Sequence, residues 1–128
     1  MVTSQALPDG LQAASARRVL RWAFALAMVG QLVVLYLPST PDAVPQIAGL
    51  DKVVHVVIFA LPVLLAVLLD ARRWVIPLLV VHAPVSELVQ GYVLPHRGMD
   101  YKDVIADLAG IVIGWILGVL VVRWRSRG

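Results

Sequence analysis

Four long apolar runs constrain what this chain can fold into more than any other feature of its sequence. Each has about 20 residues, the length that an α-helix needs to cross the hydrocarbon core of a bilayer. The runs occupy residues 19–37, 51–69, 74–94 and 104–122. Backbone polar groups in lipid must be satisfied within their own segment, and runs of this length exceed barrel strands. We therefore predict an all-α fold, a four-helix transmembrane bundle.

The composition also indicates that lipid is the solvent for most of the chain. Hydrophobic residues make up 60% of the sequence and charged residues 15%, whereas a soluble domain has about half and about a quarter. There is no cysteine, which excludes disulfides, thiolate metal sites and a cysteine nucleophile. The net charge of +3 comes mainly from arginines beside the apolar runs. This is typical of membrane proteins and not of nucleic-acid-binding proteins.

The first residues of the chain differ from the rest. Residues 1–16 are polar and contain the turn signal Pro8-Asp9-Gly10, so we expect a flexible N-terminal tail before a single transmembrane domain over residues 17–128. The first apolar run is longer than the hydrophobic region of a signal peptide, and no small-x-small cleavage site follows it. We expect it to be retained as a helix.

The distribution of lysine and arginine predicts the orientation of the bundle. One set of helix ends carries Arg17, Arg18, Arg21, Arg72, Arg73, Arg123, Arg125 and Arg127. The other set carries only Lys52, Arg97 and Lys102. By the positive-inside rule, the arginine-rich side faces the cytoplasm. Both termini and the short turn at residues 70–73 are then cytoplasmic, and the longer connections at residues 38–50 and 95–103 lie outside.

Polar side chains from three of the predicted helices gather near the outer ends of these helices. In chain order they are Asp51, Lys52, His55, Glu87, Gln90, Asp103 and Asp107. Helical spacing places His55, Glu87 and Asp107 within about two turns, or roughly 10 Å, of those ends. An ionised side chain left in hydrocarbon costs at least about 2.5 kcal/mol. We therefore expect these groups to face one another or a water-filled pocket.

The acidic face of the fourth predicted helix also carries three glycines. Gly110, Gly114 and Gly118 form two overlapping G-x-x-x-G motifs on the face that carries Asp103 and Asp107. Such motifs let a neighbouring helix approach closely. We therefore expect this face to be packed against another helix and turned away from lipid.

The charges in the polar layer do not balance. Its four carboxylates are accompanied by two cationic side chains, Lys52 and Arg97, when His55 is neutral. A protonated histidine, a protonated carboxyl or a bound cation would each correct the imbalance. The sequence leaves these three open, and it predicts no particular metal site.

Each polar residue also has a purely structural interpretation. Asp103 is suited to cap its helix, and Lys52 to extend its amine to the membrane surface. His55 would bond to Glu87 or to a backbone carbonyl, and Arg97 would form an ion pair with Glu87 or Asp103. Gln90 has the chemistry of a hydrogen bond between helices.

In order and spacing, these residues resemble those of the VanZ-like family. The matching elements are Asp51-Lys52-x-x-His55, Glu87-x-x-Gln90, Arg97 six residues before Asp103, and the glycines at 110 and 114. The resemblance covers roughly residues 38–118. The family usually has asparagine where this chain has Asp107, which gives this chain an additional carboxylate.

The resemblance implies a small multi-pass protein of the bacterial plasma membrane that modulates glycopeptide susceptibility. The namesake of the family is associated with resistance to teicoplanin more than to vancomycin. The implied site faces outward and binds an anionic, lipid-linked envelope molecule, such as a cell-wall precursor, or the lipid anchor site of a lipoglycopeptide. Lys52, His55 and Arg97 would meet the anion and Glu87 would orient them, while Gln90, Asp103 and Asp107 complete the site. Membrane lipids are expected partners, and a homo-oligomer is left open.

Two other functions are compatible with the same residues. In the first, His55 and Glu87 are a catalytic acid and base, with or without a divalent cation, in an enzyme acting on a lipid-linked phosphate. The sequence shows no recognised nucleophile for it, because Ser86 should point to a different face from Glu87. In the second, the polar layer only locks the bundle and binds no ligand. The sequence does not identify a cofactor.

Overall fold

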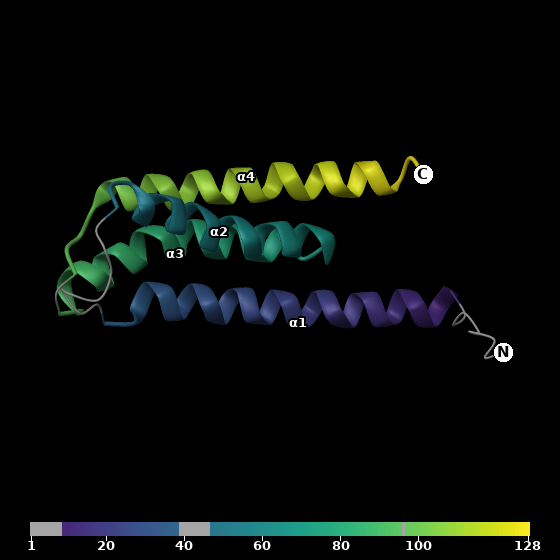
Figure 1. Ribbon diagram of the computed structural model, residues 1–128, viewed down its shortest axis with the longest axis horizontal. Helices are drawn as coiled ribbons and strands as arrows, with labels where there is room; N and C mark the ends of the chain where they lie inside the picture. The colour runs from purple at the N-terminus through teal and green to yellow at the C-terminus, as the bar shows by residue number, and fades with distance from the viewer. Residues whose placement is uncertain (1–8, 39–46, 96) are drawn as a thin grey trace.

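The computed structural model describes residues 9–38, 47–95 and 97–128, and in these residues the chain forms four α-helices and no strand (Figure 1). The helices are α1 (Asp9–Tyr36), α2 (Leu50–Leu68), α3 (Arg72–Tyr92) and α4 (Tyr101–Arg125). Each is long and apolar enough to cross a membrane. The predicted all-α, four-helix fold is confirmed, and the chain is a multi-pass membrane protein.

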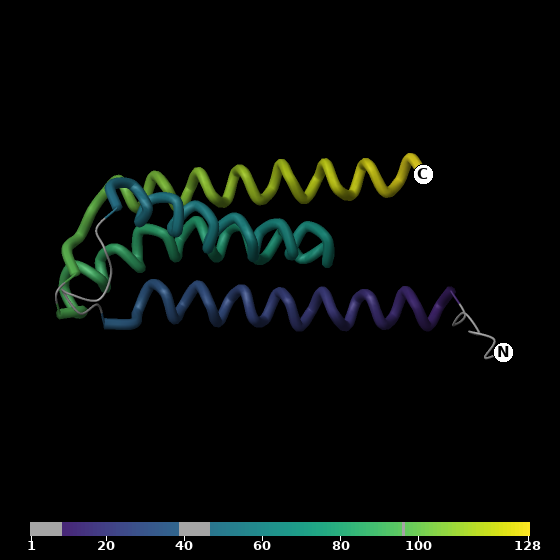
Figure 2. The backbone as a smooth tube through the Cα atoms, in the orientation of Figure 1, coloured from purple at the N-terminus to yellow at the C-terminus, as the bar shows by residue number. Residues whose placement is uncertain are grey.

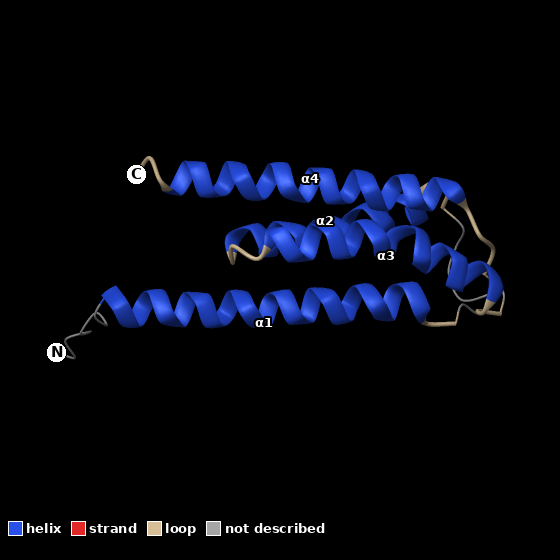
Figure 3. Cartoon of the chain, turned by 180° about the vertical axis from the view of Figure 1, so that it is seen from behind, coloured by secondary structure: helices blue, strands red, loops and turns tan. Residues whose placement is uncertain are grey.

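The helices run side by side, with α2 and α3 between α1 and α4 (Figure 2). The most extensive packing is that of α2 on α4, and α1 lies against α2 and α3. Both termini lie at one end of the bundle (Figure 3). We call the opposite end, where α1 and α3 finish and α2 and α4 begin, the loop end. The predicted short turn between the second and third helices is present, and Asp70 within it has a φ of 57°, which aspartate tolerates better than most residues.

The start of α1 corrects one expectation. Residues 9–16 are helical and not part of a flexible tail, because α1 begins at Asp9 and continues without a break into the first apolar run. Alanine and glutamine in this stretch favour helix, and an acidic residue in the first turn interacts well with the helix dipole. Residues 1–8 lie outside the described part of the chain. The remaining boundaries agree with expectation to within about three residues.

The start of α4 corrects a second expectation. Its N-cap is Asp100 and not Asp103, since the Asp100 side chain accepts a hydrogen bond of 2.9 Å from the backbone N–H of Lys102. Asp103 therefore lies inside the first turn of the helix. Its carboxylate is free to point toward α2.

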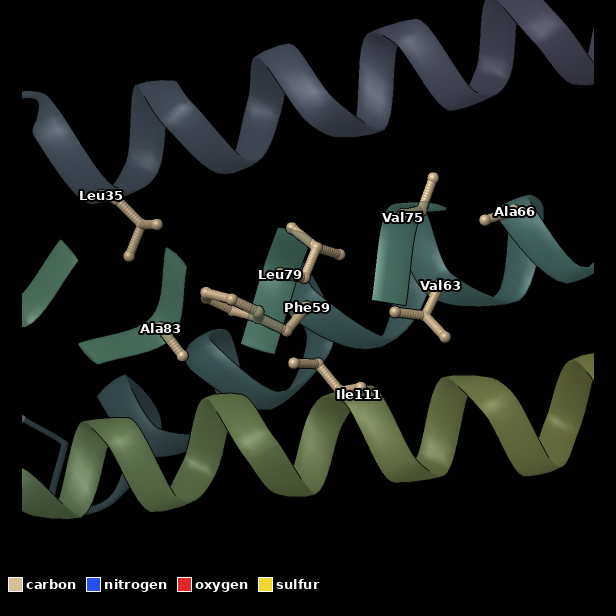
Figure 4. Close-up of a cluster of buried hydrophobic side chains, with 8 residues drawn as sticks. All are labelled: Leu35, Phe59, Val63, Ala66, Val75, Leu79, Ala83 and Ile111. Atoms are coloured by element: carbon tan, nitrogen blue, oxygen red, sulfur yellow. The ribbon is translucent and has the colours of Figure 1, made fainter. Parts of the chain in front are cut away.

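The apolar core runs along the inside of the bundle and draws on all four helices (Figure 4). Its members are Leu35, Phe59, Val63, Ala66, Val75, Leu79, Ala83 and Ile111. Lipid solvates the outward faces of the helices, so this core is small for a chain of this length. Contacts between helix backbones supply the rest of the packing.

The glycine face of α4 packs directly on the backbone of α2, as expected. A Cβ atom added at Gly114 would lie 2.9 Å from the Cα atom of Ala60, and one added at Gly118 would lie 2.7 Å from Cβ of Val67. Only glycine allows this approach, which is the geometry that G-x-x-x-G motifs permit. This contact sets the register of α4 on α2 and brings the acidic residues of α4 beside the N-terminal turns of α2.

Candidate functional site

A cluster of polar side chains occupies the loop end of the bundle between α2, α3 and α4. We call it the polar cluster and define it as Lys52, His55, Glu87, Gln90, Asp103 and Asp107. All of these residues except Lys52 are buried. Glu87 is 1% exposed and Asp107 is 0% exposed. The structure thus brings six of the seven residues predicted to form the site to one end of the bundle, and the expectation that such groups face one another is confirmed for His55, Asp103 and Asp107.

The best-defined contact in the cluster joins α2 to α4. The Nδ1 atom of His55 lies 2.8 Å from Oδ1 of Asp107. The other ring nitrogen, Nε2, lies 3.9 Å from Oδ2 of Asp103. The expectation that His55 bonds to Glu87 or to a backbone carbonyl is therefore wrong. The extra carboxylate of this chain is its partner.

Lys52 is held by three carboxylates. Its Nζ atom donates to Asp51 Oδ2 at 2.9 Å, to Asp100 Oδ2 at 2.8 Å and to Oδ1 of Asp103. An ammonium group has three donors, and these contacts use all of them. Lys52 also holds the pKa of the Asp100 carboxyl below its usual range. The lysine therefore ties the loop before α4 to the start of α2, instead of extending freely to the membrane surface.

Arg97, the seventh predicted site residue, lies beside the cluster and reaches α1. Its guanidinium donates to the carbonyl oxygens of Val34 at 3.0 Å and Leu35 at 3.2 Å, and to Oε1 of Gln90 at 3.2 Å. The last carbonyls of a helix lack partners within it and accept well from arginine. Asp103 forms an ion pair with Lys52. Gln90 thus links α3 to the loop that follows it.

Glu87 is the single acidic residue of α3, and its buried carboxylate has only one of its two oxygens hydrogen-bonded. Its Oε2 atom accepts a hydrogen bond of 3.0 Å from the backbone N–H of Asp100. Its Oε1 atom is buried without a hydrogen-bond partner among the described residues. The same holds for Nε2 of Gln90 and Oδ2 of Asp107. An unsatisfied buried polar atom costs about 1–3 kcal/mol. Three such atoms in one small region are therefore unusual where the side chains serve packing alone.

Ser86 is occupied elsewhere, as its position on the helix predicts. Its hydroxyl is buried and donates to the carbonyl of Ala83 at 2.8 Å, within its own helix. It therefore points away from a nucleophile's position beside Glu87. This contact agrees with the prediction that Ser86 does not face the same way as Glu87.

Two polar features of the bundle were not anticipated from the sequence. Gln31 of α1 is 1% exposed, and neither of its amide atoms has a partner among the described residues. Tyr36 Oη lies 2.8 Å from Nε2 of His82, whose ring also stacks on Phe59. The burial of Gln31 could have been suspected from its position inside an apolar run. For His82 the sequence offered no signal, since its partner lies on a distant segment.

The polar cluster offers carboxylate oxygens that could accept a cation, and Lys52 and Arg97 at its edge could donate to an anion. It contains three buried carboxylates and one ammonium group, and the imidazole is oriented by a carboxylate. No protein-family model, curated protein or solved structure matches the chain.

Proposed function

We propose that this chain is a VanZ-like protein of the bacterial plasma membrane that modulates susceptibility to glycopeptides, teicoplanin in particular. The observation that carries the proposal is the buried, half-satisfied carboxylate of Glu87 at the loop end of the bundle, between three helices. Intramembrane ionisable residues are costly and are mostly functional. The residues that carry the resemblance also support the proposal, because they are the ones that form the polar cluster and the glycine contact.

The proposed ligand is an anionic, lipid-linked envelope molecule that approaches from the outer leaflet. Lys52 and Arg97 would bind its anionic group at the rim of the cluster. Each side chain would give up some of its present hydrogen bonds to do so. Asp51 is the partner most readily displaced from Lys52, since 61% of its side chain is exposed, against 40% for Asp100. Glu87 would then accept a hydrogen bond from the polar part of the ligand, and the amide nitrogen of Gln90 would donate one to it.

Complementation in a bacterial host tests this proposal through Glu87. Wild-type protein is expected to raise the inhibitory concentration of teicoplanin severalfold, and more than that of vancomycin. Glu87→Gln keeps the volume of the side chain and removes its charge, so we expect it to lose most of this protection. Leu88→Ala is the matched control, because Leu88 is its neighbour on the exposed side of α3. Protein levels in the membrane are compared by immunoblot.

Equal protection by wild type and Glu87→Gln would make the buried carboxylate structural. Absence of protection by wild type itself would remove the resistance role from this chain. Loss of protection by Leu88→Ala as well would assign the effect to folding and not to the site.

The orientation is tested by labelling of single cysteines, for which the chain offers a background free of cysteine. We expect a membrane-impermeant maleimide added to intact cells to label Met99→Cys, at the loop end, and not Ser126→Cys, after α4. Both positions are exposed. The physical reason is the excess of arginine at the end of the bundle that holds the termini. Labelling of Ser126→Cys alone would invert the topology and place the polar cluster on the cytoplasmic side.

A further inference from the structure

Three buried residues of the polar cluster have the arrangement of metal ligands. His55, Glu87 and Asp103 each offer one ligand atom, and these atoms all lie within 4.8 Å of one another. They come from three different helices, α2, α3 and α4. Because the helices are held by the apolar core and the glycine contact, the three side chains are brought together by the fold and not by chance on one surface.

The imidazole is oriented as it is in metal sites. Asp107 binds Nδ1 of His55 at 2.8 Å. The remaining nitrogen, Nε2, is directed toward Oδ2 of Asp103, 3.9 Å away. Histidine ligands almost always donate their second ring N–H to a carboxylate, a carbonyl or water, which fixes the ring and raises its basicity. Asp107 is thus a positioning residue, and it is the carboxylate that distinguishes this chain from the usual pattern of the resembling family.

Glu87 supplies an independent observation that points to a ligand. Its Oε1 atom is buried and has no partner among the described residues, although the side chain is only 1% exposed. Asp103 likewise gives one oxygen to Lys52 and turns the other toward His55. A bound cation would satisfy the Oε1 atom of Glu87, which no hydrogen-bond donor of the described residues reaches.

We propose that His55, Glu87 and Asp103 bind one divalent transition-metal ion of the Zn²⁺ or Mn²⁺ class. An imidazole nitrogen with two carboxylates selects such ions over Mg²⁺ and Ca²⁺, which prefer oxygen ligands alone. Ligand atoms at about 2.0–2.2 Å from Zn²⁺ lie closer together than the present spread. Binding therefore draws the side chains inward by on the order of 1 Å. The proposed metal site uses residues of the polar cluster, as the proposed function does, and it depends on that function in no other way.

Zinc binding to the purified full-length protein tests the proposal. The protein in detergent is stripped with a chelator, loaded with Zn²⁺ and desalted, and the metal is counted by mass spectrometry and titrated by calorimetry. We expect about one Zn²⁺ per chain for wild type. Affinity should fall at least tenfold in His55→Gln and in Glu87→Gln, a loss typical of damaged metal sites. Asp70→Asn removes an exposed carboxylate from the far end of the bundle and should bind as wild type does.

A second measurement keeps the proposal testable if a variant fails to fold. X-ray absorption of the wild-type protein loaded with Zn²⁺ should show scattering from one imidazole, with oxygen ligands completing the shell. Substoichiometric zinc, absence of imidazole scattering, or unchanged affinity in both folded variants would overturn the metal site, and a proton or Lys52 alone would then balance the carboxylates.

The metal site and the susceptibility role fail separately. One zinc per chain in a protein that gives no protection against teicoplanin would remove the proposed function and leave the metal site. Protection that depends on Glu87 in a protein that binds no zinc would remove the metal site and leave the function.

Discussion

Replacing Gly114 with leucine is expected to prevent α4 from packing on α2. A Cβ atom at this position already meets the backbone of Ala60, with its carbonyl carbon and Cα both 2.9 Å away. Backbone cannot rotate aside as a flexible side chain can, so the two helices must separate. Overpacking of this kind costs about 1–3 kcal/mol in a well-packed core. We expect Gly114→Ala to lie in that range and Gly114→Leu to exceed it.

Gly30 of α1 provides the matched control, because a Cβ atom there meets nothing within 4 Å. Alanine in an open helical position is neutral or stabilising by up to about 1 kcal/mol. Unfolding of purified protein in mixed micelles, followed by circular dichroism, compares the three proteins. If Gly114→Leu unfolds at the same denaturant concentration as Gly30→Ala, the close contact of α2 with α4 is not what holds the bundle together.

The elements of this bundle were predictable because lipid simplifies the physics of folding. A segment that crosses a bilayer must satisfy its own backbone, so apolar length alone located the four helices. Helical periodicity then identified the packed faces, and the glycine motif of α4 identified its contact face. The gathering of His55, Glu87 and Asp107 followed from depth and from the cost of leaving charge in hydrocarbon.

The partners within the cluster were not predictable from periodicity. Spacing along one helix fixes a face and a depth, but a hydrogen bond also needs the register and rotation of the neighbouring helix. Gly110 meets α2 at Val56 and Phe59, and this register sets His55 opposite Asp107 instead of Glu87. The ion pair of Lys52 with Asp100 was not predictable for the same reason, because Asp100 lies in the loop before α4.

The start of α1 was missed for a different reason. Pro8-Asp9-Gly10 is a typical turn signal, yet an aspartate near a proline also suits the first turn of a helix. Polarity outside the membrane carries no information about order, since an aqueous helix extension needs no apolar face when it continues a transmembrane helix. The helix is nucleated by the apolar run and extends into water from it.

Removing His55 alone is expected to destabilise the bundle far more than removing His55 and Asp107 together. In His55→Leu, the carboxylate of Asp107 stays fully buried and loses the partner at 2.8 Å. Breaking a buried charge-assisted pair from one side costs about 3–5 kcal/mol, whereas replacing both partners by apolar residues is often neutral. The double variant His55→Leu, Asp107→Leu should therefore recover most of the loss.

The cycle is measured as free energy of unfolding in the presence of a chelator, so that no bound metal contributes. Asp107→Leu alone should cost less than His55→Leu, because a neutral imidazole left behind is cheaper to bury than a carboxylate. The control cycle uses Val53→Leu and Val112→Leu, which lie on exposed faces of the same two helices and should add independently. Additive losses in the His55–Asp107 cycle would mean that each residue is held by other groups. The carboxylate would then have no part in orienting the imidazole.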